Sequence, residues 1–179
     1  MKDLKEFNIP FVGLREGSHL FEYHIGKKFF EVYNFDEFND CNVNATVNLV
    51  KKSSFFELDF TVSGTVNVPC DVTNELFDQE INGNLHLIVK FGHEYNDDSE
   101  EILIIPHEEY QINVSQYIYE LIILSVPTKR VHPDVLDGTM ESETLKKLEE
   151  LKIKEDKKIV EQSSTDPRWD KLKDLLTDK

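Results

Sequence analysis

Three side chains in this sequence have the chemistry of a catalytic group: the carboxyl of Glu120, the imidazole of His132 and the thiol of Cys70. Glu120 interrupts the apolar run INVSQYIYELIILSVP, residues 112–127. A carboxyl group held among apolar side chains has a raised pKa and can act as a general acid. Together with His132 or Cys70 it would suit a small cytoplasmic hydrolase, which is one hypothesis for this chain.

The same glutamate also has a structural interpretation. A buried charge is costly unless it is paired, and Lys129 and Arg130 come just after the apolar run. In this interpretation Glu120 is buried and forms an ion pair that fastens a helix to the Lys129–Arg130 turn. We favour the ion pair, and the catalytic interpretation stays open.

Lys129, Arg130 and His132 form the only compact basic cluster outside the C-terminal region. Such a cluster can bind a phosphate group, or it can simply pair with carboxylates at the rim of the domain. The sequence favours neither interpretation, so the three residues are candidate binding residues.

Metal and cofactor motifs are not found in the sequence. His107-Glu108-Glu109-Tyr110-Gln111 begins like a zinc-protease helix, but its fifth residue is not histidine. Cys41 and Cys70 are too few for a four-cysteine zinc site, and the acidic run from Glu94 to Glu101 lacks the spacing of a calcium loop. We therefore predict no metal and no cofactor.

The formal net charge of the 179 residues is −15, and residues 1–130 carry 10 basic and 22 acidic groups. Nucleic-acid binding relies on Lys and Arg that neutralise phosphates, so this acidic body argues against a broad RNA-binding face. It suits a basic protein partner, although acidic composition is also common in proteins that are merely soluble. Any RNA contact is expected only at residues 129–132 and in the C-terminal segment.

Alternating apolar and polar residues predict strands in the first 110 residues. The pattern runs from Val43 to Leu49 and from Phe56 to Val62, and Gly64 then breaks it. Asn82-Gly83-Asn84 signals a turn before the strand from Leu85 to Phe91. We expect an α+β fold: an antiparallel β-sheet or partly closed β-barrel with a buried helix, plus a charged helical C-terminal arm.

The buried helix is expected over residues 113–126, with Asn113 as its cap, Gln116 in a variant capping box and Pro127 at its end. After it, residues 141–161 carry 13 charged groups of 21, which is typical of a solvated helix or flexible arm. The predicted domains are a β-rich globular domain over 1–135, a charged helical arm or linker over 136–165 and an amphipathic helix over 166–179.

The last helix is predicted to dock through the only tryptophan of the chain. Asp166 and Pro167 form a helix start, and Trp169 lies on its apolar face. Arg168 and Lys171 flank that face, so these two residues and Trp169 join the candidate binding residues. So short a helix needs packing to persist. It either folds back on its own sheet or reaches a partner protein, and the sequence does not decide between the two.

Three segments of the chain resemble the YceD family, in a Bacteroidetes-type form: GTVNVPCD at 64–71, NVSQYIYELIILSVPTKRVHPD at 113–134 and DPRWDKLKDLL at 166–176. The family's Cys-x-x-Cys pair is incomplete here, because Cys70 matches the first cysteine but Thr73 stands at the second. No second pair follows His132-Pro133. The chain thus resembles a member that lacks the cysteine pairs, and we expect no four-cysteine zinc site.

The resemblance implies a non-enzymatic ribosome-biogenesis factor that supports accumulation of large-subunit ribosomal RNA. It would act by binding a ribosomal protein or pre-ribosomal RNA. The acidic body favours a basic ribosomal protein of the large subunit or pre-ribosomal particle, with limited contact to ribosomal RNA. No apolar stretch approaches the length of a membrane span. We therefore expect a cytoplasmic protein with free thiols and no membrane association, and the sequence leaves its oligomeric state open.

Overall fold

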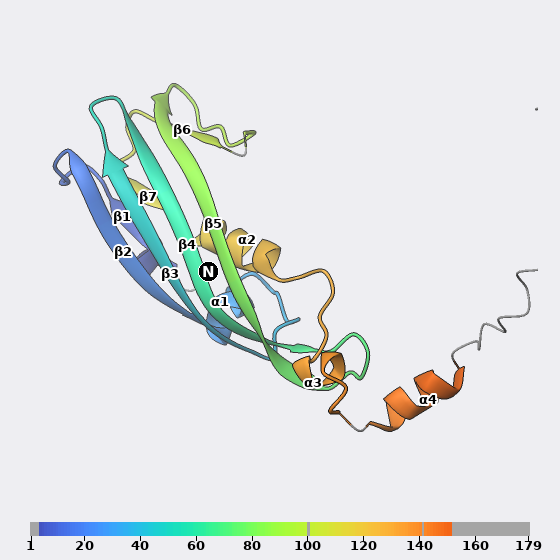
Figure 1. Ribbon diagram of the computed structural model, residues 1–179. Coiled ribbons are helices and arrows are strands. Elements are labelled where there is room, and N and C mark those ends of the chain that lie inside the picture. Colours follow the sequence, from blue (N-terminus) through green and yellow to red (C-terminus); the bar gives the residue numbers. More distant parts are fainter. Residues whose placement is uncertain (1–3, 100, 141, 152–179) are drawn as a thin grey trace, which may run out of the picture. The chain divides into compact units, whose positions relative to one another are not determined.

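The computed structural model describes residues 4–99, 101–140 and 142–151 (Figure 1). The chain divides into two compact units, Met1–Met140 and Glu141–Lys179. The predicted helix over 166–176, with Arg168, Trp169 and Lys171, lies outside the described residues. The elements of the first unit are η1 (Lys5–Phe7), β1 (Asn8–Pro10), β2 (Gly17–Gly26), α1 (Lys27–Val32), β3 (Asp40–Lys51), β4 (Phe55–Pro69), β5 (Leu76–Gly92), β6 (Ile102–Pro106), β7 (Gln111–Asn113), α2 (Ser115–Ser125) and α3 (Pro133–Leu136).

The second unit contains the helix α4 (Glu143–Leu151). The helix begins with an acidic residue, Glu143, in its first turn, and its Leu148 and Leu151 are exposed. A helix is therefore present in the predicted charged arm, over the part of it that the structure describes.

Five strands form the main sheet, in the order β2-β3-β4-β5-β6. Neighbours from β2 to β5 are antiparallel, whereas β6 runs parallel to β5. A separate antiparallel pair joins β1, near the start of this unit, to β7, which lies just before α2. The α+β fold class is confirmed, and the sheet is open rather than closed into a barrel.

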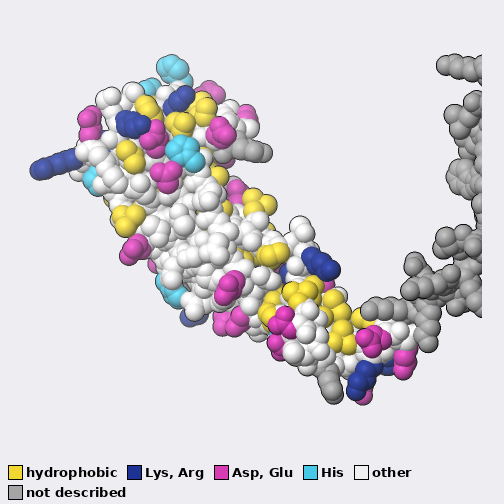
Figure 2. Space-filling view, in the orientation of Figure 1, with side chains coloured by type: hydrophobic (Ala, Val, Ile, Leu, Met, Phe, Trp, Pro, Cys, Tyr) yellow, Lys and Arg dark blue, Asp and Glu magenta, His cyan; other side chains and the backbone are white. Residues whose placement is uncertain are grey.

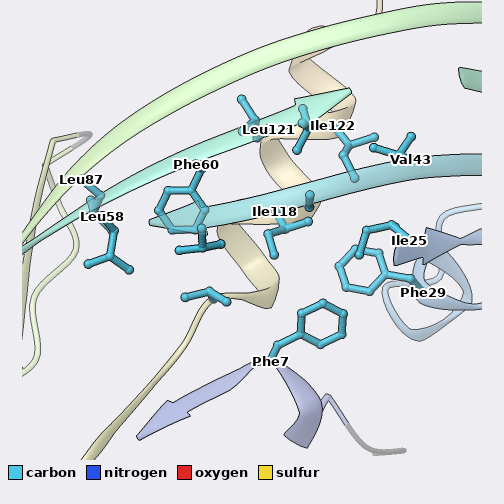
Figure 3. Close-up of a cluster of buried hydrophobic side chains, with 14 of the residues drawn as sticks. Phe7, Ile25, Phe29, Val43, Leu58, Phe60, Leu87, Ile118, Leu121 and Ile122 are labelled. Carbon is cyan, nitrogen blue, oxygen red and sulfur yellow. The ribbon is translucent and has the colours of Figure 1, made fainter. Parts of the chain in front are cut away.

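The core lies between one face of the sheet and the helices behind it (Figure 1). Every second residue of β3 and β4 is buried because side chains alternate across a strand. From the opposite side α2 contributes Ile118, Leu121 and Ile122, which point toward the sheet residues Phe60 and Val43 in Figure 3. Phe7 of η1 and Phe29 of α1 complete the cluster, and their ring centroids are 5.1 Å apart.

The sequence pattern predicted a break in the strands at Gly64 and a turn at Gly83, but both glycines lie inside continuous strands. β4 passes through Gly64, whose φ is +152°, and a Cβ there would lie 2.2 Å from the backbone oxygen of Asn42. β5 likewise passes through Asn82-Gly83-Asn84 without turning. The predicted turn is wrong because Gly83 serves close packing against α2, where a Cβ would meet Ser125.

The other face of the sheet is largely polar. Figure 2 shows this face, and its centre is mostly white, the colour of the backbone and of side chains that are neither charged nor apolar. Side chains there come from the alternate positions of the central strands. They are mostly amides and hydroxyls: Asn42, Asn44, Thr46, Asn48, Thr61, Ser63, Thr65, Asn67, Asn82 and Asn84.

The helix α2 is buried on one side only. Ser115, Ile118, Leu121 and Ile122 are buried, whereas Leu124 is 82% exposed. The expected cap is also different: the side chain of Asn113 accepts from the N–H of Ser115, two residues on, and Val114 occupies the N-cap position. Of the described helices, none combines the length and apolar character needed to cross a membrane.

Candidate interaction site beside β5 and α3

The segment that follows α2 is bound to the turn between β4 and β5. The N–H of Asp71 donates to the carbonyl of Arg130 at 2.8 Å, and the N–H of Arg130 donates to Oδ2 of Asp71 at 2.7 Å. The N–H of His132 donates to Sγ of Cys70 at 3.3 Å. These hydrogen bonds fix residues 130–132 against the turn between β4 and β5, although the two segments are about sixty residues apart in the chain.

Arg130 is used within the fold. Its guanidinium lies 3.5 Å from Oδ1 of Asp71 and 4.0 Å from Oε2 of Glu37. Only 27% of the side chain is exposed. A guanidinium already engaged by two carboxylates is a poor phosphate ligand. Arg130 therefore favours the interpretation in which the basic cluster pairs with carboxylates of the domain over the one in which it binds phosphate.

His132 is also engaged locally. Its Nδ1 accepts from the N–H of Asp134 at 3.1 Å, which caps the short helix α3. Its ring packs on Phe77 of β5, with centroids 5.4 Å apart. The imidazole therefore holds α3 against the first residues of β5.

Lys129 is exposed and lies at an open groove between β5 and the chain that leads into α3. The groove has a volume of about 530 Å³. Its β5 wall includes the acidic Asp78 and Glu80, which sequence analysis did not single out. Their alternation with Phe77 and Gln79 is the strand pattern that could have revealed them. The opposite wall is largely apolar and contains Pro127, Lys129, Val131, Pro133 and Leu136.

Glu120 is not where the sequence interpretation placed it. The residue is exposed, and its Oε1 accepts from Nε2 of Gln116 at 2.9 Å, one turn earlier on α2. The expected burial and the ion pair with the Lys129–Arg130 turn are wrong, because Glu120 lies on the face of α2 that points away from the sheet. It lines a second cavity of about 510 Å³ that also includes Leu85, Asp97, Asp98 and Leu124.

Cys70 is a buried free thiol with an unusual set of donors. Burial raises its pKa, but the N–H groups of His132, Thr73 and Val72 and the hydroxyl of Thr73 donate to the sulfur and lower the pKa to about 7. Thr73 thus contacts the sulfur from the position at which the resembled family has its second cysteine. Within the described residues no group of three or more His, Cys, Asp or Glu side chains is arranged to hold a metal.

Comparison with known families gives a match over residues 58–176, about two thirds of the chain. The matching family is described as large ribosomal RNA subunit accumulation protein YceD. The matched region includes the Cys70 turn, β5, α2 and the segment that leads into α3. No curated protein and no solved structure matches the chain.

Proposed function

Because the chain belongs to the YceD family of large ribosomal RNA subunit accumulation proteins, we propose that it is a non-enzymatic ribosome-biogenesis factor that binds a basic ribosomal protein. The family's name indicates the role in large-subunit RNA accumulation. The identity of the partner, a basic ribosomal protein, is our proposal. That this chain acts in the cytoplasm is also our proposal.

The arrangement of charge around the groove beside β5 and α3 carries this proposal. Arg130 is paired with Asp71 and Glu37, and His132 caps α3, so Lys129 is the exposed member of the basic cluster. The same groove exposes Asp78 and Glu80. A site with this balance repels phosphates and attracts Lys and Arg side chains. It therefore favours a basic protein over RNA.

Neutralising the two acids tests this proposal. Asp78→Asn/Glu80→Gln keeps the shape of both side chains, and Glu108→Gln/Glu109→Gln makes the same charge change in an exposed turn after β6. The protein and both variants are used to capture proteins from RNase-treated extract. Captured ribosomal proteins are identified by mass spectrometry, and the best one is purified for titration at several salt concentrations.

We expect one large-subunit ribosomal protein to remain bound after RNase treatment, with affinity that falls as salt rises. The variant at Asp78 and Glu80 should bind it roughly threefold to tenfold more weakly, and the control variant should bind it unchanged. Capture that disappears with RNase would show that RNA is the partner and contradict the proposal.

The alternative, a small hydrolase, has one observation in its favour, the lowered pKa of Cys70. The thiol is only 2% exposed, however, and Glu120 lines the other cavity. Hydrolysis of a p-nitrophenyl ester by the purified protein, abolished by Cys70→Ser, would support the hydrolase. Equal, background-level rates for the two proteins would exclude Cys70 as a nucleophile toward that ester.

A further inference from the structure

Within the described residues, β5 is paired along only part of its length on the β6 side. Its ladder with β4 runs from Leu76 to Lys90, but β6 pairs only with Ile88–Gly92. Among the described residues, no strand pairs with the β6-side edge of β5 from Leu76 to Leu87. In Figure 1 the chain after α2 runs down to α3, beside the lower part of β5.

The direction of the backbone groups at this edge follows from one hydrogen bond. The N–H of Ile88 donates to the carbonyl of Glu101, on the β6 side. Backbone groups alternate in direction along a strand, and the register with β4 is continuous. The even-numbered residues of β5 therefore point their N–H and C=O groups to the open edge. They are Asp78, Glu80, Asn82, Asn84 and His86. One of the groups at this edge, the carbonyl of Glu80, already accepts from Nε2 of Gln79 at 2.9 Å.

Two cavities flank this edge, and both combine acidic with apolar side chains. The groove beside β5 and α3 has Asp78 and Glu80 with Leu136, which is 72% exposed. The second cavity, between α2 and the loop before β6, has Asp97, Asp98 and Glu120 with the exposed Leu124. Among the described residues that line these cavities, Lys129 is the only basic one.

We propose that the open edge of β5 takes up an extended basic segment of the partner protein as an added strand. This inference rests on the proposed function and specifies how the partner binds. Strand addition gives affinity through backbone hydrogen bonds and specificity through alternate side chains. The segment should alternate apolar residues, which face Leu124 and Leu136, with basic ones, which face Asp78 and Glu80.

The acidic side chains along the β5 edge favour a basic partner segment over a second copy of the chain. Two β5 edges paired through Asp78 and Glu80 would place the acidic residues of both copies in contact, and like charges opposed across strands are destabilising. Charged residues on edges commonly prevent such pairing. The acids that repel another copy attract a strand rich in Lys or Arg.

Amide hydrogen exchange of the full chain tests the proposal. The probe is a capped nine-residue peptide of alternating lysine and valine. The control peptide has the same residues, with alternate amides N-methylated so that one of its edges cannot donate. We expect the lysine–valine peptide to slow exchange at the five edge-directed amides and to bind at least tenfold more tightly than the control. The strand β2, at the other edge of the sheet, is an internal reference whose exchange should not change.

Three results would overturn the inference. Equal binding of both peptides would show general charge attraction. Edge amides that are already protected in the free monomer would mean that another segment of the chain covers the edge, and protection that rises with protein concentration would identify a second copy. If the ribosomal partner depends on Asp78 and Glu80 but leaves the edge amides exchanging freely, the proposed function stands and strand addition fails.

Discussion

Gly83 of β5 lies directly under Ser125 of α2: a Cβ on Gly83 would come within 2.0 Å of Oγ of Ser125. It would also lie 3.1 Å from Cδ1 of Leu121. The missing side chain lets α2 lie close to the strand that borders the proposed binding edge. The hydroxyl of Ser125 is itself held, since it donates to the carbonyl of Leu121 at 2.6 Å.

Gly83→Ala should therefore destabilise the protein by about 1–3 kcal/mol, because overpacking forces α2 to shift. The free energy of unfolding in urea measures this. Gly13→Ala is the matched control, since no atom lies within 4 Å of its Cβ. Adding Ser125→Ala to Gly83→Ala should restore part of the lost stability, and a Gly83→Ala protein as stable as the parent would disprove the close contact.

Replacing Arg130 should lower the stability of the protein, whereas replacing the exposed Lys129 should not. Arg130→Ala removes the ion pairs to Asp71 and Glu37 and should lower the free energy of unfolding by about 1 kcal/mol, as expected for partly exposed pairs. Lys129→Ala should leave stability unchanged. Thermal unfolding of both variants checks this, and equal melting temperatures would contradict the assignment.

The two thiols should ionise at widely different pH. Cys70 should ionise at about pH 7, whereas burial and, to a smaller extent, the Asp40 carboxylate raise the pKa of Cys41 to about 12. Thiolate absorbance at 240 nm during a pH titration below the ionisation of the tyrosines follows Cys70, and Cys41 should give no step in that range. Cys70→Ser should remove the step near pH 7, Cys41→Ser should leave it, and a single step near pH 9 would refute the donor set at Cys70.

The free energy of unfolding should also depend on the ionisation of Cys70. The pKa of Cys70 in the fold is below that of a thiol in the unfolded chain, so between about pH 7 and 8.5 the unfolded chain binds more protons. The contribution of Cys70 to stability is complete above that window and is lost as the pH falls through 7. The stability difference between the parent and Cys70→Ser should therefore shift in favour of the parent as the pH rises from 7 to 8.5.

Glu120→Ala should change the free energy of unfolding by less than about 0.5 kcal/mol, because the side chain is exposed and bonded only to Gln116 among the described residues. Ile118→Ala is the contrasting variant on the buried face of the same helix. It should cost about 2–5 kcal/mol. Urea titrations of the two variants give the comparison, and similar losses for both would mean that Glu120 is not exposed.

Period-two alternation was sufficient to predict β3 and the part of β4 before Gly64, because one face of each strand is buried and the other is not. It failed at Gly83. The sequence Asn82-Gly83-Asn84 has the composition of a turn, and only the distant Ser125 explains why glycine is needed there. A contact between residues forty positions apart leaves no local signal.

Glu120 shows a second limit of the sequence. Counting apolar neighbours suggested a helix buried all round, but Gln116, Glu120 and Leu124 follow one another at intervals of four and share the exposed face of α2. Which face of a helix meets the sheet depends on tertiary packing. The groove was missed for the same reason, since its walls come from β5 and from residues more than forty positions later.

The pairing of β1 with β7 has a consequence for the order of events during synthesis. Asn8 pairs with Asn113 across 105 positions, and the N–H of Val114 donates to the carbonyl of Phe7. The strands from β2 to β5 meet neighbours that are close in sequence, so they can pair early. Phe7, Ile9 and Phe11 leave the ribosome about a hundred residues before β7, and they stay without their partner strand until residue 113 has emerged. The β1 segment is thus synthesised before the main sheet but is among the last parts of this unit to fold, and it is the part that a chaperone would have to shield.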